Sequence, residues 1–229
     1  MNIAGEYRCL GEIDISPIQQ IIAGLTDAHW DDDHSIKQTL DGFQNTQNIA
    51  LVWDSDLRHK KPSRQPALNM FLDAIKPALN AVANFFESDE RWKRYLGDTG
   101  RGYFIRAFLV QLKAGVQISE HLDKGYSLNH SHRIFIPILT NDAVFFEIDK
   151  MTLNLFEGEI VEVNNRMPHS IINQSNQNSI HLILDWVIPN EHCCCGNRQH
   201  SEEPCDAIRC KETDLLIEPC HCFKNDAIV

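Results

Sequence analysis

The sequence lacks long hydrophobic runs, since no stretch approaches the roughly 20 consecutive apolar residues that a membrane-spanning helix needs. The first residues, MNIAGEYRCLGEIDIS, have no basic start followed by an apolar stretch, so they do not predict a signal peptide. We therefore expect a cytoplasmic protein without a membrane partner. In that compartment free cysteines are the rule and disulfides the exception.

Positive charge is also scarce. The chain has 21 Lys and Arg against 32 Asp and Glu, which gives a formal net charge of −11. An acidic surface repels the phosphate backbone of nucleic acids, so nucleic acid is not an expected partner. The short basic run Arg58-His59-Lys60-Lys61 is typical of a solvated loop.

Cysteine is nearly absent from the first 190 residues, where Cys9 stands alone, and the other seven cysteines all follow residue 190. We expect an N-terminal mixed α/β region over residues 1–99, a β-barrel core over 100–189 and a Cys-rich tail over 190–229. The cysteine spacings in the tail do not follow the paired C-x2–4-C pattern typical of zinc modules. Zinc or another soft metal, free thiols, and disulfide or redox chemistry are all open for the tail.

The N-terminal region predicts two helices and a strand. Ser16-Pro17 is typical of a helix start and predicts a helix to about Leu25. The β-prone segment NIALVWD, residues 48–54, predicts a strand. Apolar residues at helical spacing predict a helix over residues 65–86, kinked or split at Pro77.

After Gly100, short β-prone segments alternate with turn residues. The expected strands cover residues 103–112, 116–123, 132–139, 143–147, 151–155, 159–164, 169–173 and 179–187. Many short, closely spaced strands favour a sandwich or a closed double sheet over a βαβ layout. We therefore predict a mainly β protein with N-terminal helices, built on a double-stranded β-helix core of the jelly-roll, cupin-like kind.

A candidate metal site comes from the H-x-D pair His121 and Asp123. Side chains alternate along a strand, so these two project from the same face. His169, at the start of another expected strand, is the candidate third ligand. Two histidines and one carboxylate on one side of a metal leave positions open for a co-substrate and O2, which suits non-haem Fe(II). The alternative is that His121 and Asp123 form a surface pair and His169 caps a turn.

Arg133 lies on an expected strand of the barrel. An arginine inside an apolar barrel is costly unless it meets an anion, and a guanidinium is well shaped to bind a carboxylate. Arg133 therefore contacts either an anionic ligand or a salt-bridge partner such as Glu147 or Asp149. If Arg133 points inward, its neighbour points outward, so we interpret His130 and His132 as loop or outer-face residues.

Four motifs together resemble a known family. They are the H-x-D strand, RIFIPILTN (133–141), GEIVEVNN (158–165) and HSIIN (169–173). In this combination the sequence resembles the aspartyl/asparaginyl β-hydroxylase-like 2-oxoglutarate oxygenases, which include bacterial free-proline cis-hydroxylases. The resemblance covers about residues 100–187. The N-terminal region matches loosely, and the tail does not match the family core.

The resemblance implies an Fe(II)/2-oxoglutarate-dependent dioxygenase that hydroxylates an amino acid, or an amino-acid residue of Asp, Asn or Pro type in a peptide or protein. It implies three Fe(II) ligands, which are His121, Asp123 and His169. Arg133 is implied as an anchor for a carboxylate of 2-oxoglutarate. Arg106 and Asn165 lie where family members have residues near the pocket, and we assign them to substrate binding.

One position departs from the family pattern. Ser179 stands where the family usually has an arginine, ten residues after the second histidine. Arg133 then holds the carboxylate with help from Ser179 and His181, or the co-substrate binds differently, or the co-substrate site is weakened. The last possibility gives the alternative function, a cupin-like metal- or ligand-binding protein with altered or lost turnover.

Overall fold

The structure of the protein is a computed structural model. It describes residues 3, 5–30, 34–40, 42–55, 62–93, 95–96, 100–123, 126–188 and 191. Apart from Glu191, the Cys-rich tail lies outside the described residues, and so do the expectations of zinc or redox chemistry there. The basic run at residues 58–61 lies outside them as well.

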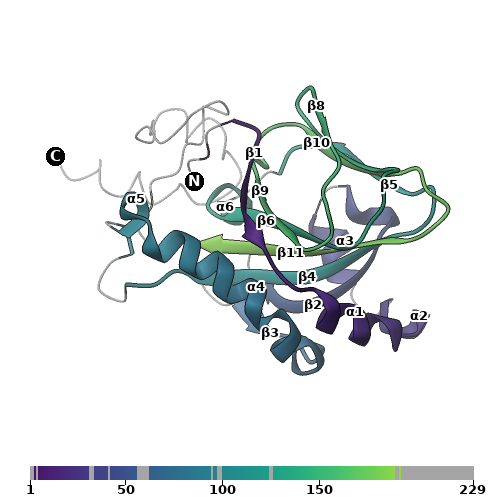
Figure 1. The fold of residues 1–229 in the computed structure, drawn as a ribbon, viewed down its shortest axis with the longest axis horizontal. Coiled ribbons are helices and arrows are strands. Elements are labelled where there is room, and N and C mark those ends of the chain that lie inside the picture. The colour runs from purple at the N-terminus through teal and green to yellow at the C-terminus, as the bar shows by residue number, and fades with distance from the viewer. Residues whose placement is uncertain are drawn as a thin grey trace.

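Two antiparallel sheets make up the core (Figure 1). The larger sheet has the order β1 (Tyr7–Glu12), β9 (Glu159–Val163), β6 (His132–Leu139), β11 (Ser179–Val187), β4 (Tyr103–Leu112), β2 (Gln47–Asp54) and β3 (Pro62–Arg64). The smaller sheet has the order β5 (Gln117–His121), β10 (His169–Asn173), β7 (Val144–Ile148) and β8 (Met151–Leu153). The predicted mainly β fold with a jelly-roll core is confirmed.

The helices lie mostly in the N-terminal part of the chain. They are α1 (Ser16–Ala23), α2 (Asp27–Trp30), α3 (His34–Thr39), the 3-10 helix η1 (Phe43–Asn45), α4 (Leu68–Ser88), α5 (Glu90–Lys93) and α6 (Tyr126–Asn129). Figure 1 shows the long helix α4 lying across the larger sheet. Helix α4 continues through Pro77, so the helix is not split there, and the alternative of a kink stays a prediction. Its buried stripe, which includes Phe71, Ile75 and Phe86, fixes it against the sheet.

The N-terminal region supplies part of the larger sheet. Strand β1 pairs with β9, beginning with Tyr7 opposite Val163, and β2 pairs with β4. Strands β1 and β3 were not predicted from the sequence. The boundaries proposed at residues 99 and 189 stay predictions, but three strands from residues 1–99 are hydrogen-bonded into the same sheet as the barrel strands.

The larger sheet separates two hydrophobic clusters. Along β11, Leu182 and Leu184 belong to the cluster that α1 and α4 cover, whereas Ile183 belongs to the cluster shared with the smaller sheet. Side chains alternate along a strand, so the odd-numbered residues of β11 face the space between the two sheets. That space is the interior of the barrel and holds the candidate site.

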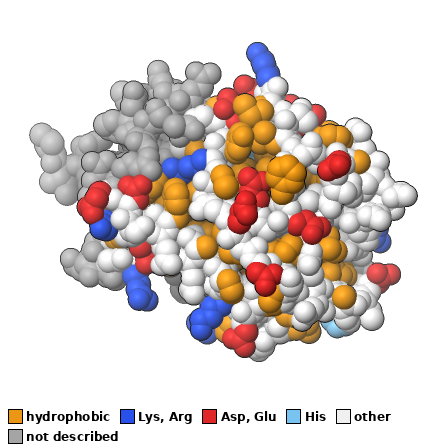
Figure 2. All heavy atoms as spheres, viewed as in Figure 1, with side chains coloured by type: hydrophobic (Ala, Val, Ile, Leu, Met, Phe, Trp, Pro, Cys, Tyr) orange, Lys and Arg blue, Asp and Glu red, His pale blue; other side chains and the backbone are white. Residues whose placement is uncertain are grey.

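The surface carries mixed side chains. Figure 2 shows acidic side chains scattered over one face among hydrophobic and uncharged ones. Among the helices that the structure describes, none combines the length and the apolar character needed to cross a membrane.

Candidate metal centre

Three predicted residues come together at one edge of the smaller sheet. His121 ends β5 and His169 begins β10, and the two are directly opposite each other in the antiparallel register. Their ring centroids lie 4.3 Å apart. Asp123 follows β5 two residues after His121. One ligand atom from each of the three residues lies within 4.8 Å of the others.

Both imidazole rings are oriented by backbone hydrogen bonds. Nδ1 of His121 donates to the carbonyl oxygen of Ser119 at 2.8 Å, and Nδ1 of His169 donates to that of Met167 at 2.9 Å. A proton on Nδ1 leaves Nε2 with its lone pair, which is how a second hydrogen bond prepares a metal-binding histidine. In both rings, Nε2 is therefore the atom that can bind a metal.

Two atoms of the centre are buried without partners. Nε2 of His121 lies 3.8 Å from Oδ1 of Asp123, and neither atom has a hydrogen-bond partner. Buried polar atoms without partners are rare in folded proteins. A cation between the rings and the carboxylate would satisfy both atoms, and two nitrogens with one oxygen suit a transition metal such as Fe(II). The residues present therefore fit the implied metal.

Burial keeps His169 in the form that binds a metal. Desolvation lowers the pKa of His169 to about 4, although the nearby carboxylate of Asp123 acts in the opposite direction. A metal ion binds the neutral imidazole and competes with the proton for it. At neutral pH His169 needs to lose no proton before it can act as a ligand.

The second oxygen of Asp123 is held by the protein. Oδ2 accepts hydrogen bonds from Nη1 of Arg133 at 2.5 Å and from Nδ2 of Asn165 at 3.0 Å. The backbone N–H of Asp123 also donates to the carbonyl oxygen of Asn165 at 3.2 Å. Asn165 therefore holds both the backbone and the side chain of Asp123. The substrate-binding role assigned to Asn165 stays a prediction.

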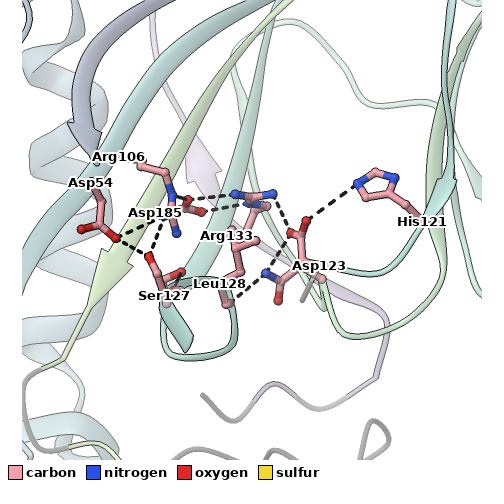
Figure 3. A network of polar contacts seen from close by, with 10 residues as sticks. Asp54, Arg106, His121, Asp123, Ser127, Leu128, Arg133 and Asp185 are labelled. Atoms are coloured by element: carbon pink, nitrogen blue, oxygen red, sulfur yellow. Dashed lines mark hydrogen bonds and ion pairs between the residues drawn. The ribbon is translucent and has the colours of Figure 1, made fainter. Parts of the chain in front are cut away.

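A row of buried, alternating charges continues from Asp123 (Figure 3). Arg133 donates from Nε and Nη2 to the two oxygens of Asp185, each at 2.9 Å. Arg106 donates to the same carboxylate. Burial alone would raise the pKa of Asp185, but the two guanidinium groups hold it well below its usual range. Asp185 is thus a buried anion shared by two arginines.

The row ends in the N-terminal region. Nη1 of Arg106 donates to Oγ of Ser127 at 2.6 Å and lies 3.4 Å from Oδ2 of Asp54, which belongs to β2. Nη2 of Arg106 is buried without a hydrogen-bond partner. The predicted binding of substrate by Arg106 stays a prediction, and this free nitrogen is the atom available for it.

Arg133 points into the barrel, a direction that the strand pattern had left open, and its partners are Asp123 and Asp185 instead of the suggested Glu147 or Asp149. Its Nε, Nη1 and Nη2 atoms each donate to a carboxylate already. Its predicted role as an anchor for 2-oxoglutarate stays a prediction.

Ser179 and His181 add two neutral polar groups to the interior. Both lie on the inward face of β11 and are buried, at 0% and 3% exposure. Oγ of Ser179 and both ring nitrogens of His181 have no hydrogen-bond partner. Burial lowers the pKa of His181 to about 4, so its ring is neutral at pH 7. These atoms are available to a polar ligand inside the barrel.

His132 points to the opposite face of the sheet, which confirms its predicted outward direction. There it is buried against Phe86, with ring centroids 4.4 Å apart. Its Nδ1 and Nε2 each lie 2.6 Å from a carboxylate oxygen, of Glu162 and Glu191 respectively. Burial opposes its charge, but the two carboxylates raise the pKa of His132 overall. His130 lies in the turn after α6.

Three residues around the centre were not predicted from the sequence. Gly42 has φ +84°, and a Cβ at this position would stand 3.0 Å from Nδ1 of His121. Phe43 meets the ring of His121 edge-on, with centroids 6.2 Å apart. No sequence pattern indicated either contact. Asp185 could have been predicted from the sequence as an inward-facing residue, because alternation along β11 puts it on the same face as Ser179 and His181.

Comparison with known proteins gives a sequence match over part of the chain. Residues 93–189 match the profile of the family described as aspartyl/asparaginyl beta-hydroxylase. No curated protein matches the chain.

Comparison with solved structures gives matches at low sequence identity. One, described as an oxidoreductase of the 2OG-Fe(II) oxygenase family from Burkholderia pseudomallei, has 12% identity and a TM-score of 0.50, covering 84% of this chain and 82% of that chain. A predicted oxalate decarboxylase from Thermotoga maritima has 15% identity and a TM-score of 0.31, covering 37% of this chain and 67% of that one. A Cupin 2 conserved barrel domain protein from Salinispora arenicola has 14% identity and a TM-score of 0.29, covering 38% and 74%.

At 12% identity, the Burkholderia structure indicates a shared fold. The profile match, in contrast, lies in the sequence itself and spans all three candidate ligands. It confirms the resemblance to the aspartyl/asparaginyl beta-hydroxylase family that the motifs between residues 100 and 187 predicted.

Proposed function

We propose that this protein is an Fe(II)- and 2-oxoglutarate-dependent dioxygenase that hydroxylates an amino acid, or an Asp, Asn or Pro residue of a peptide or protein. One observation carries the proposal. Nε2 of His121 and Oδ1 of Asp123 are buried without partners beside His169, within one coordination sphere. The family profile over residues 93–189 supports the same reaction class.

His121, Asp123 and His169 would hold the metal. When bound there, Fe(II) supplies the activation of O2 that couples decarboxylation of 2-oxoglutarate to hydroxylation of a C–H bond. Three protein ligands on one side of a metal leave about three positions for the co-substrate and O2. The surrounding apolar cluster, which includes Phe43, Phe108 and Phe146, excludes water from the centre.

Arg133 and Asn165 would favour binding of a metal through one oxygen of Asp123. Both donate to Oδ2, so this oxygen is engaged and Oδ1 alone is offered to the metal. A carboxylate bound through both oxygens would occupy a further coordination position. The hydrogen bonds to Oδ2 therefore help to preserve the open positions that the reaction needs.

We assign the distal carboxylate of 2-oxoglutarate to Ser179 and His181, with Arg133 as the cation that lines the same interior. The unpartnered Oγ of Ser179 and the unpartnered ring of His181 support this assignment. A buried hydroxyl and a neutral imidazole can each donate one hydrogen bond. The free Nη2 of Arg106 supports the assignment of Arg106 to a substrate carboxylate, since guanidinium groups bind carboxylates well.

A substrate screen tests the proposal. The full chain is supplied with Fe(II), 2-oxoglutarate and O2, and offered free amino acids and peptides that contain Asp, Asn or Pro. We expect at least one substrate to raise succinate formation and to gain one oxygen atom by mass spectrometry. Asp123→Ala should abolish both signals. Succinate formation that is equal in the wild type and in Asp123→Ala would overturn the proposal.

The second candidate function is a metal- and ligand-binding protein without turnover. Ser179, at the position of the usual arginine, favours it, because the interior then offers neutral donors in place of a free cation. This candidate predicts metal binding that depends on His121 but no succinate with any substrate. Recovery of turnover in Ser179→Arg would identify the missing cation as the cause.

A further inference from the structure

A hollow lies beside α4, on the face of the larger sheet that is turned away from the metal centre. It has a volume of about 500 Å³ and is formed by β2, by the edge strand β3, by α4, by the start of β4 and by the end of β11. Its wall residues Trp186 and Phe104 pack with the helix-covered cluster. The metal centre lies between the two sheets, so the sheet itself separates the two sites.

The hollow contains a buried donor without a partner. Trp186 is 2% exposed, and its Nε1 has no hydrogen-bond partner. The indole edge that carries Nε1 lies against Gly102, another lining residue, since a Cβ on Gly102 would stand 2.5 Å from Cε2 of Trp186. A buried indole N–H usually has an acceptor, so this one indicates that the hollow takes a ligand with an acceptor group.

The same hollow carries positive charge. The side chain of Arg64, exposed on β3, has no ion pair or hydrogen bond in the part of the chain that the structure describes. Arg101 also lines the hollow. Glu87, the acidic residue among the lining residues described, accepts a hydrogen bond from the backbone N–H of Gly102 at 3.1 Å. On a chain with a net charge of −11, this is a local concentration of donors and cations suited to an anion.

The rest of the lining combines two asparagines of α4, Asn80 and Asn84, with an apolar and partly aromatic side. The ring of Phe104 meets that of Trp186 at a centroid distance of 4.7 Å, and Val52, Pro62 and Ala83 complete this side. An inorganic anion would leave this apolar surface uncovered. Small-molecule sites typically pair apolar and aromatic surface with polar groups that fix orientation, and this hollow offers both.

We propose that the hollow bounded by Arg64, Arg101 and Trp186 is a second ligand site that binds a small organic carboxylate with a flat apolar body. The carboxylate faces the guanidinium of Arg64, with the indole N–H of Trp186 as a further donor. The body packs against Trp186 and Phe104. The site is independent of the metal centre and does not rest on the proposed dioxygenase activity.

Benzoate is a suitable probe for the full chain, measured by titration calorimetry and by tryptophan fluorescence at constant ionic strength. We expect saturable binding that Arg64→Gln weakens about tenfold or more, because a charge-assisted hydrogen bond typically contributes about 1.5–3 kcal/mol. Trp186→Phe should weaken binding and remove the fluorescence response. Arg64 is exposed, so its replacement should leave the melting temperature unchanged.

Three controls locate the site. Lys113→Gln removes the same charge from an exposed position elsewhere and should bind benzoate like the wild type. His121→Ala should also retain binding, which separates this site from the metal centre. Inorganic phosphate should bind more weakly than benzoate, because it cannot cover the aromatic wall. No saturable binding of benzoate, equal weakening by Arg64→Gln and Lys113→Gln, or loss of binding in His121→Ala would each overturn the proposal.

Discussion

Arg133 and Asp123 meet through a single carboxylate oxygen. Nη1 of Arg133 donates to Oδ2 of Asp123 at 2.5 Å, while Oδ1 is buried without a hydrogen-bond partner and faces Nε2 of His121 at 3.8 Å. One oxygen is thus held by the protein and the other is available to a cation.

Asp123→Asn tests the role of Oδ1. The change keeps the size of the side chain but removes its charge, so we expect metal affinity to fall by more than about 100-fold. Groups that only orient a ligand already contribute about 10–100-fold. Affinity is measured by calorimetry with Fe(II) under anaerobic conditions. Asp142→Asn, at an exposed position, is the matched control and should bind metal normally. Equal affinities in the two variants would contradict the assignment.

Asp185→Asn tests the row of buried charges. Two buried arginines would lose their shared anion, and removing one partner of a buried ion pair typically costs about 3–5 kcal/mol of stability. Metal affinity should also fall, because Arg133 would then form a stronger ion pair with the carboxylate of Asp123. Chemical denaturation gives the stability, again with Asp142→Asn as the control. An unchanged denaturation midpoint in Asp185→Asn would show that the row does not stabilise the fold.

Ser179→Ala tests the proposed contact with the co-substrate. Oγ of Ser179 has no partner within the protein, so its removal should leave the thermal stability of the ligand-free protein unchanged. The KM for 2-oxoglutarate should rise several-fold if the hydroxyl donates to the co-substrate. Ser170→Ala is the contrasting variant, because Oγ of Ser170 donates to Glu147 at 3.0 Å and lies outside the proposed contact. A KM that is the same in both variants would remove Ser179 from the binding site.

Gly42→Ala tests how the N-terminal region supports His121. A Cβ at Gly42 would stand 2.8 Å from Ile118 and 3.0 Å from His121, at a φ of +84°. We expect a loss of about 1–3 kcal/mol in stability together with weaker metal binding. Gly115→Ala, at φ +74° with open space around it, carries the same backbone cost without the clash. Weaker metal binding should therefore appear in Gly42→Ala alone.

The elements that the sequence predicted well are those with a strong local pattern. Strands β4, β6, β10 and β11 occur with the predicted bounds, and alternation correctly put Arg133 and His132 on opposite faces of β6. The H-x-D pair and His169 were chosen for their residue types and spacing, and the structure brings them within 4.8 Å.

Contacts between segments that are far apart in the sequence have no local sequence pattern that would predict them. Arg106 meets Asp54 across 52 residues, and Gly42 approaches His121 across 79, so only the folded chain shows these pairs. The β1 strand was also missed, since its partner β9 lies about 150 residues away and Gly11 interrupts its register. The protonation state of His181 could not be predicted from the sequence either. Its ring is neutral because it is buried in the folded protein, and burial does not follow from its neighbours in sequence.

The ionisation of His181 predicts sensitivity to acid. Burial lowers its pKa from 6.5 to about 4 in the folded protein, so the unfolded chain binds this proton more readily. Stability is therefore lost as the pH falls from about 6.5 to about 4, by about 3 kcal/mol in total for this group. Between these two pH values, the loss of unfolding free energy should be smaller in His181→Asn than in the wild type by about 3 kcal/mol. Denaturation of the metal-free proteins measures the difference. The same acid dependence in both proteins would contradict the buried, neutral state of His181.

Anaerobic titration with Fe(II) followed by 2-oxoglutarate tests the central claim most directly, because it reports metal binding and co-substrate chelation in the absence of turnover. We predict that one Fe(II) binds per chain and that 2-oxoglutarate then produces a weak visible charge-transfer band. Both signals should be absent in His121→Ala and unchanged in His29→Ala, an exposed histidine outside the centre. Fe(II) binding and a band that persist in His121→Ala would contradict the account.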